Sequence, residues 1–167
     1  FYHPPTSKTL LTIFNPLNLL GNLEWNDWTG MISKKIIVAL DCDNLKHALN
    51  IVKNLKQEVF AFKIGYEFFF NFGLEGYKTI QKEDVRIFLD LKLHDIPNTV
   101  KKGIYAISNL NPYFTTIHLS GGDEMQIAAN TSKQRTKILG VSVLTSLNSE
   151  QTKKFYFNKD VEGIVSN

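Results

Sequence analysis

Apolar runs alternate with stretches of helical spacing along most of the chain. From residue 36 onward a strand-like run begins roughly every 25 residues, near Ile36, Val59, Val85, Phe114, Ile138 and Val161. Apolar strands that alternate with helices are typical of a parallel sheet covered by helices. The sequence therefore predicts an α/β fold.

For two of the intervening helices, the residues at the start also favour a helix. One has apolar residues at helical spacing from Leu45 to Leu55, directly after a possible cap at Asp43-Asn44. The other has Val100, Ile104 and Ile107 in helical spacing after Pro97, and proline suits the first turn of a helix.

Such a sheet can form a (β/α)8 barrel or an open doubly wound sheet. No Gly-x-Gly-x-x-Gly follows the first predicted strand, which disfavours the dinucleotide-binding form of the open sheet. A barrel needs eight strand-helix units and usually over about 200 residues. The 167 residues supply about six units, so the prediction is an incomplete barrel.

Residues 1–30 have neither period and are rich in Pro, Asn, Leu and Trp. The first methionine is Met31, and a clean predicted strand begins at Ile36. We therefore expect residues 1–30 to be an appendage and residues 31–167 to form the barrel domain.

Composition narrows the function classes. The chain is 43% hydrophobic and 21% charged, which suffices for one domain with a core. The net charge of +3 comes without a long basic run, so neither nucleic acid nor an acidic membrane surface is an expected partner. No apolar stretch is long enough to span a bilayer, and Leu10–Phe14 is too short for a signal peptide. The single cysteine, Cys42, fits a reducing compartment and predicts a cytoplasmic protein.

Polar residues recur at five successive predicted strand ends. These are Asp41, Lys63, the pair Asp90 and Lys92, His118, and Thr145-Ser146. Ligands of α/β folds gather at the carboxyl ends of the strands. The sequence therefore predicts a polar site at this edge.

The densest group of charges is Asp90, Lys92 and Asp95. Asp90 and Lys92 are two apart on a predicted strand, which would place both side chains on one face, and Asp95 follows the strand end. A structural salt-bridge network is one interpretation. With Asp41 and Lys63 on the same rim, an active site is the other, because partly buried charges at about 4 Å interact by roughly 4 kcal/mol. An ammonium between carboxylates can stabilise a nascent carbanion and then protonate it.

The remaining polar and aromatic residues allow plainer interpretations. His94 and His118 could be structural or could line the pocket. Thr145-Ser146 could cap a helix that begins near Asn148, or could offer hydroxyls to a ligand. The aromatic residues between Tyr66 and Phe72 are expected to pack in the core. No set of side chains has convincing metal-binding spacing, so no metal is predicted.

The segment Asp90-Leu-Lys-Leu-His-Asp-Ile-Pro-Asn-Thr99 resembles the signature of orotidine 5'-phosphate decarboxylases. Four further segments agree with that family: Val38-Ala-Leu-Asp41, Phe62-Lys63-Ile-Gly65, His118-Leu-Ser-Gly-Gly122 and Val143-Leu-Thr-Ser146. Sister sugar-phosphate synthases of the same barrel superfamily share the core Asp-x-Lys-x-x-Asp, but the Ile96-Pro97-Asn98-Thr99 extension favours the decarboxylase.

The resemblance implies conversion of orotidine 5'-monophosphate to UMP and CO2, without cofactor or metal. Lys92 would donate the proton after CO2 leaves, with Asp90 beside the reacting carbon. Asp41 and Lys63 would contact the ribose and the charged network, and Thr145 the pyrimidine ring. Asp95 and Thr99 would reach the neighbouring subunit's site, which implies a homodimer. The whole segment is expected to line the substrate site: Asp90, Leu91, Lys92, Leu93, His94, Asp95, Ile96, Pro97, Asn98 and Thr99.

The family's last two strand-helix units, with its phosphate-binding loops, have no counterpart in the sequence. We therefore expect a C-terminally truncated decarboxylase. The alternatives are an inactive remnant of that enzyme and a sister sugar-phosphate lyase or synthase.

Overall fold

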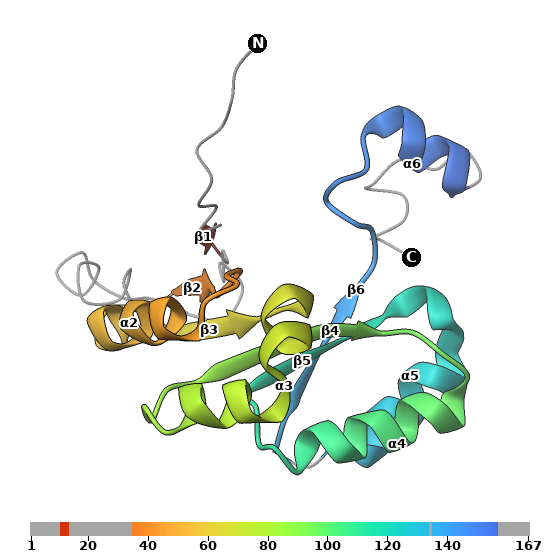
Figure 1. The fold of residues 1–167 in the computed structure, drawn as a ribbon. Helices are drawn as coiled ribbons and strands as arrows, with labels where there is room; N and C mark the ends of the chain where they lie inside the picture. The colour runs from red at the N-terminus through yellow and green to blue at the C-terminus, as the bar shows by residue number, and fades with distance from the viewer. Residues whose placement is uncertain (1–10, 14–34, 134, 157–167) are drawn as a thin grey trace, which may run out of the picture. The chain divides into compact units, whose positions relative to one another are not determined.

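The computed structural model describes residues 11–13, 35–133 and 135–156. Figure 1 shows their helices and strands, coloured from red to blue along the chain. Contacts between residues divide the chain into two compact units. Among the described residues, the first unit comprises 11–13, 35–90 and 112–114, and the second comprises 91–111, 115–133 and 135–156. Strand β4 (Ile87–Leu93) begins in the first unit and ends in the second.

The first unit is built on neighbouring strands that follow chain order, β1-β2-β3-β4. Strands β2, β3 and β4 are parallel, and Lys63 lies opposite Ala39 on one side and Phe88 on the other. A short strand β1 pairs antiparallel with β2. The bounds are β1 Leu11–Ile13, β2 Ile36–Ala39, β3 Ala61–Ile64 and β4 Ile87–Leu93.

Two helices belong to the first unit, and α2 begins where its sequence predicts. Helix α2 spans Leu45–Leu55, and the Asn44 side chain caps it by accepting a hydrogen bond from the His47 amide. Helix α3 spans Tyr66–Gln81 and is kinked at Gly73, whose φ of 56° suits glycine. Fully buried apolar side chains, among them Leu40, Phe62 and Phe68, form the core of this unit.

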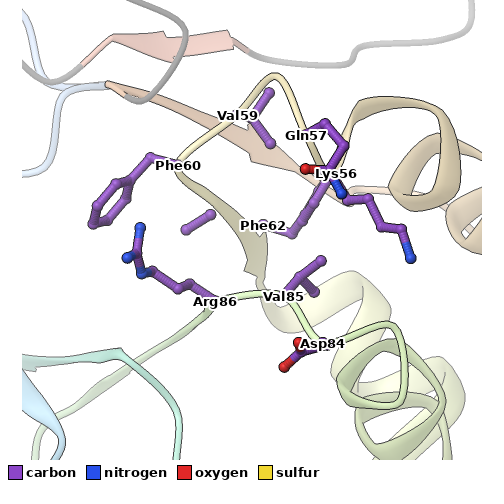
Figure 2. Close-up of a pocket in the computed structure, with 9 residues that line it drawn as sticks. Lys56, Gln57, Val59, Phe60, Phe62, Asp84, Val85 and Arg86 are labelled. Carbon is purple, nitrogen blue, oxygen red and sulfur yellow. The ribbon is translucent and has the colours of Figure 1, made fainter. Parts of the chain in front are cut away.

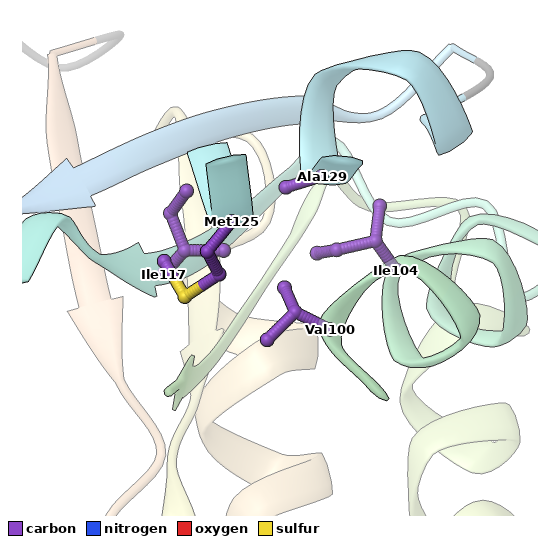
Figure 3. Packing of buried hydrophobic residues seen from close by; sticks show 5 residues of the cluster. All are labelled: Val100, Ile104, Ile117, Met125 and Ala129. Atoms are coloured by element: carbon purple, nitrogen blue, oxygen red, sulfur yellow. The ribbon is translucent and has the colours of Figure 1, made fainter. Parts of the chain in front are cut away.

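The second unit contains the end of β4 followed by strands β5 and β6, again in chain order. Buried Val100, Ile104, Ile117, Met125 and Ala129 form its core (Figure 3). Pro97 occupies the first turn of α4, as predicted. The bounds are α4 Pro97–Ser108, β5 Phe114–His118, the 3-10 helix η2 Leu119–Gly121, α5 Gly122–Ser132, β6 Lys137–Val141 and α6 Ser149–Phe155.

The strand order favours the predicted barrel over the open doubly wound sheet. A doubly wound sheet needs a point at which the strand order reverses. Among the described strands of either unit no reversal occurs. The order is that of consecutive barrel strands.

The structure leaves some sequence expectations untested and corrects others. The strand predicted near Val161 lies outside the described residues, as does most of the predicted appendage. Within residues 1–30 the sequence showed no strand period, yet Leu11–Ile13 forms β1. Of the two interpretations of Thr145-Ser146, the helix cap is wrong, because Asn148 caps α6 and Gln151 completes the capping box. Within the described ranges, no helix is long and apolar enough to cross a membrane.

Candidate active site

The Lys63 ammonium lies between two carboxylates of the first unit. Its Nζ atom is 3.3 Å from Asp41 Oδ1 and 3.9 Å from Asp90 Oδ2. The side chains of Lys63 and Asp90 are only 18% and 10% exposed. Partial burial strengthens attraction between opposite charges, so the lysine links the two acids into one network.

Strand geometry brings these three residues together. Asp41 lies just beyond β2, Lys63 lies near the end of β3, and Asp90 lies on β4. Because the three strands are parallel, their carboxyl ends meet at one edge. The predicted rim of alternating charge is therefore present among Asp41, Lys63 and Asp90.

Gly65 is a further residue of the network, and its role is not among those predicted from the sequence. A Cβ atom at this position would lie 3.1 Å from Lys63 Nζ and 3.5 Å from Asp41 Oδ1. Glycine therefore leaves the space in which the ammonium meets its first carboxylate. The sequence does contain a signal that could have indicated this role. Gly65 stands at a strand-to-helix turn, two residues after the charged Lys63.

Lys92 lies in the second unit, on the last residues of β4. Its φ is +42°, the left-handed region that non-glycine residues rarely adopt. Its amide donates a hydrogen bond of 2.8 Å to Thr116 Oγ1 on β5. The rule that side chains two apart share a face assumes a regular strand, so it does not apply at Lys92.

The loop of residues 94–96 joins β4 to α4 and is exposed. Asp95 Oδ1 accepts a hydrogen bond of 2.7 Å from the Ile96 amide, and Ile96 is 67% exposed. His94, Asn98 and Thr99 are exposed as well. Of the other residues predicted for the site, Leu91 and Pro97 are half-buried, Leu93 packs against the core, and Thr145 is exposed before α6.

Two histidines meet in the second unit. The rings of His94 and His118 have centroids 5.4 Å apart. Burial, followed by the positive charges of His94 and Lys92, lowers the pKa of His118. The neutral form of His118 is therefore favoured in the folded protein.

The expectation that all the aromatic residues between Tyr66 and Phe72 pack in the core is wrong for two of them. Phe68 is fully buried, but Tyr66 and Phe70 are 49% and 77% exposed. Their rings stack on each other at 5.6 Å, one helical turn apart on α3. The continuous aromatic run concealed that a helix buries only one face.

Cys42 is next to the charged network. Burial, followed by the nearby carboxylates of Glu67, Asp41 and Asp43, raises the pKa of its thiol. Within residues 35–133 and 135–156, no three His, Cys, Asp or Glu side chains are grouped to hold a metal ion. The absence of a cofactor stays a prediction.

A pocket of about 440 Å³ lies at the opposite, amino ends of β3 and β4 (Figure 2). Both of its cations already have partners: Lys56 pairs with Glu83, and the Arg86 guanidinium lies over the Phe60 ring. The charged network lies at the other end of the same two strands. We therefore place the candidate active site at the carboxyl ends.

Comparison with known proteins identifies the family. Residues 34–166 match the model of the "Orotidine 5'-phosphate decarboxylase / HUMPS family". The orotidine 5'-phosphate decarboxylase of Ehrlichia chaffeensis is 47% identical over 131 residues, which are 77% of this chain and 57% of that protein. The enzyme of the same name from Gluconobacter oxydans is 43% identical over 70% of this chain and 52% of its own length.

Solved structures agree. The orotidine 5'-phosphate decarboxylase of Lactobacillus acidophilus matches with a TM-score of 0.67 and 36% identity, over 78% of this chain and 63% of that one. The Pyrococcus horikoshii enzyme, at 24% identity and a TM-score of 0.59, supports the fold alone. It is matched over 65% of this chain and 51% of its own. The fold is thus a partial (β/α)8 barrel.

The chain spans about half the length of the curated relatives it matches. The matched residues nevertheless include the whole charged network and the motif from Asp90 to Thr99. The chain therefore belongs to the orotidine 5'-phosphate decarboxylase / HUMPS family.

Proposed function

We propose that the protein converts orotidine 5'-monophosphate to UMP and CO2 in pyrimidine biosynthesis. The observation that carries the proposal is the Lys63 ammonium held between Asp41 and Asp90 at the carboxyl ends of parallel strands. Two carboxylates fixed around one ammonium provide a charge pattern that is in place before substrate binds. Such preorganised charge is the means by which enzymes stabilise charge that develops in a transition state.

In the proposed reaction Asp90 lies beside C6 of the pyrimidine, where the substrate carboxylate is attached. Cleavage of the C6–carboxylate bond releases CO2 and leaves the electron pair on C6. The Lys92 ammonium stabilises this carbanion and gives it a proton, which forms the C6–H bond of UMP and leaves a neutral amine. The amine then regains a proton from water.

The remaining predicted residues bind and orient the substrate. Asp41 and Lys63 contact the ribose, and Thr145 meets the pyrimidine ring. We also propose a homodimer in which Asp95 and Thr99 enter the partner's site. In support, both residues are exposed at the start of α4, beside the exposed apolar side chain of Ile96. A cytoplasmic location is proposed because the single cysteine suits a reducing compartment.

The role of the Lys63 ammonium is tested by replacing Lys63 with methionine. Methionine keeps much of the side-chain length and removes the charge. Asp41 and Asp90 then face each other without their cation, and we expect turnover of orotidine 5'-monophosphate to fall at least about 100-fold. Lys46→Met, at an exposed position on α2, is the control and should leave turnover unchanged. Equal activity in the two variants would remove the basis of the proposal.

A parallel assay tests the sister activity, with a hexulose phosphate as the substrate. The family description covers both kinds of enzyme. Release of formaldehyde from the sugar phosphate without decarboxylation of orotidine 5'-monophosphate would replace the proposed function by the sister one. Absence of both activities in a folded protein would indicate the inactive remnant.

A further inference from the structure

Lys92 has a backbone conformation that must be held by its surroundings. A φ of +42° brings the Cβ atom of any L-residue close to its own backbone. Such conformations persist where the surrounding structure over-determines them, and they cluster at active sites. The question is which group in the second unit holds Lys92 there.

Thr116 is placed to do so. Its Oγ1 accepts the Lys92 amide hydrogen bond at 2.8 Å, where a regular ladder would offer a backbone carbonyl. Thr116 is 3% exposed on β5, and its branched side chain has few allowed rotamers. The acceptor is therefore fixed in position, and it fixes the Lys92 amide in turn.

We propose that Thr116 is a positioning residue, which sets the Lys92 backbone and thereby the path of the lysine side chain toward the reacting carbon. The inference rests on the proposed function, since it gives Thr116 a role through the proton donor. Rotation about φ swings the whole side chain, so a modest backbone change moves the ammonium far. A misplacement of about 1 Å can cost on the order of 100-fold in rate.

The neighbouring residue provides a matched control. Thr115 lies on the same strand, is fully buried, and points to the opposite face. Its hydroxyl has no hydrogen-bond partner among the described residues. Replacing either threonine by valine removes one buried hydroxyl with little change of shape, but only Thr116→Val removes the acceptor of the Lys92 amide.

The experiment compares Thr116→Val, Thr116→Ser and Thr115→Val with the unsubstituted full chain. Hydrogen exchange of the Lys92 amide is followed by NMR, and decarboxylation of orotidine 5'-monophosphate gives kcat and KM. We expect Thr116→Val to speed exchange of that amide and to lower kcat at least about tenfold, with KM little changed. Thr116→Ser retains the hydroxyl, so amide protection and kcat should stay close to those of the unsubstituted chain. Thr115→Val should change neither the exchange of the Lys92 amide nor kcat.

Equal exchange rates in Thr116→Val and Thr115→Val would overturn the inference, and so would equal kcat values in an active protein. An unsubstituted chain without turnover would instead refute the proposed function, and the amide exchange would still decide whether Thr116 holds Lys92. If Thr116→Val fails to fold, the Thr116→Ser variant tests the inference in its place. A kcat near that of the unsubstituted chain with a protected amide then supports the inference, whereas loss of both despite the hydroxyl contradicts it.

Discussion

At the residue scale, the position of Lys63 depends on the glycine two residues after it. The space that Gly65 leaves open is the space that the Lys63 ammonium uses to reach Asp41. Charge alone does not build this network, because a side chain at residue 65 would compete with it. The glycine is part of the site although it carries no functional group.

Gly65→Ala should therefore lower activity without unfolding the protein. The added methyl group would press on the flexible end of Lys63, so we expect kcat/KM for orotidine 5'-monophosphate to fall about tenfold. Gly103→Ala on α4 is the control, since its Cβ would meet Leu93 at an ordinary 3.4 Å. Steady-state kinetics give kcat/KM for both variants and test this prediction. Similar values for the two would show that Lys63 has room to adjust.

His118 should make stability depend on pH. Its pKa is lowered in the folded protein, so the unfolded chain binds the proton more readily as pH falls below about 7. The free energy of unfolding should decrease from pH 7.5 to pH 5.5, and His118→Asn should make this decrease smaller. Urea denaturation at the two pH values measures it. A pH dependence that His118→Asn leaves unchanged would contradict this prediction.

The charged members of the network were predictable because charge at a strand end is visible in sequence. Asp41, Lys63 and Asp90 stand in a pattern that apolar strands rarely carry. Gly65 and Thr116 were not singled out, because their roles depend on distances to side chains on other segments. Such distances exist only after the strands have paired.

At the element scale, helix α4 is held against the end of β4 and against α5 by the core of the second unit (Figure 3). Ile104 is fully buried in this cluster, on the helix that begins at Pro97. The same packing fixes the direction in which the loop from His94 to Ile96 leaves the strand. Packing of α4 therefore bears on the site as well as on stability.

Ile104→Ala should destabilise the protein by about 2–5 kcal/mol, the range for emptying a packed core position. Ile127→Ala on α5 removes the same atoms from a side chain that is 63% exposed. That control should cost below about 0.5 kcal/mol. Denaturant unfolding of the two variants provides the comparison. Similar losses in both would mean that Ile104 is not packed as the structure has it.

Periodicity predicted the elements well and the irregular positions poorly. The helix starts at Asn44 and Pro97 followed from local chemistry, which acts within one turn. The pairing of β1 with β2 and the left-handed backbone at Lys92 depend on contacts with distant segments. No local pattern encodes them.

At the scale of the whole molecule, the proposed dimer gives each site residues from two chains. If Asp95 completes the partner's site, then mixing inactive Lys92→Ala and Asp95→Ala proteins should create heterodimers with one intact site each. Random exchange of subunits would restore about a quarter of the sites. Decarboxylase assays on the mixture, with each protein alone as the control, measure this. A mixture no more active than its components would contradict shared sites.

The most direct measurement is decarboxylation of orotidine 5'-monophosphate by the purified full chain, beside Lys92→Ala and Lys46→Ala. We predict production of UMP that Lys92→Ala abolishes and Lys46→Ala leaves intact, with circular dichroism showing that all three are folded. Turnover that survives in Lys92→Ala would contradict the assignment of the proton donor. No turnover by the folded, unsubstituted chain would contradict the proposed activity itself.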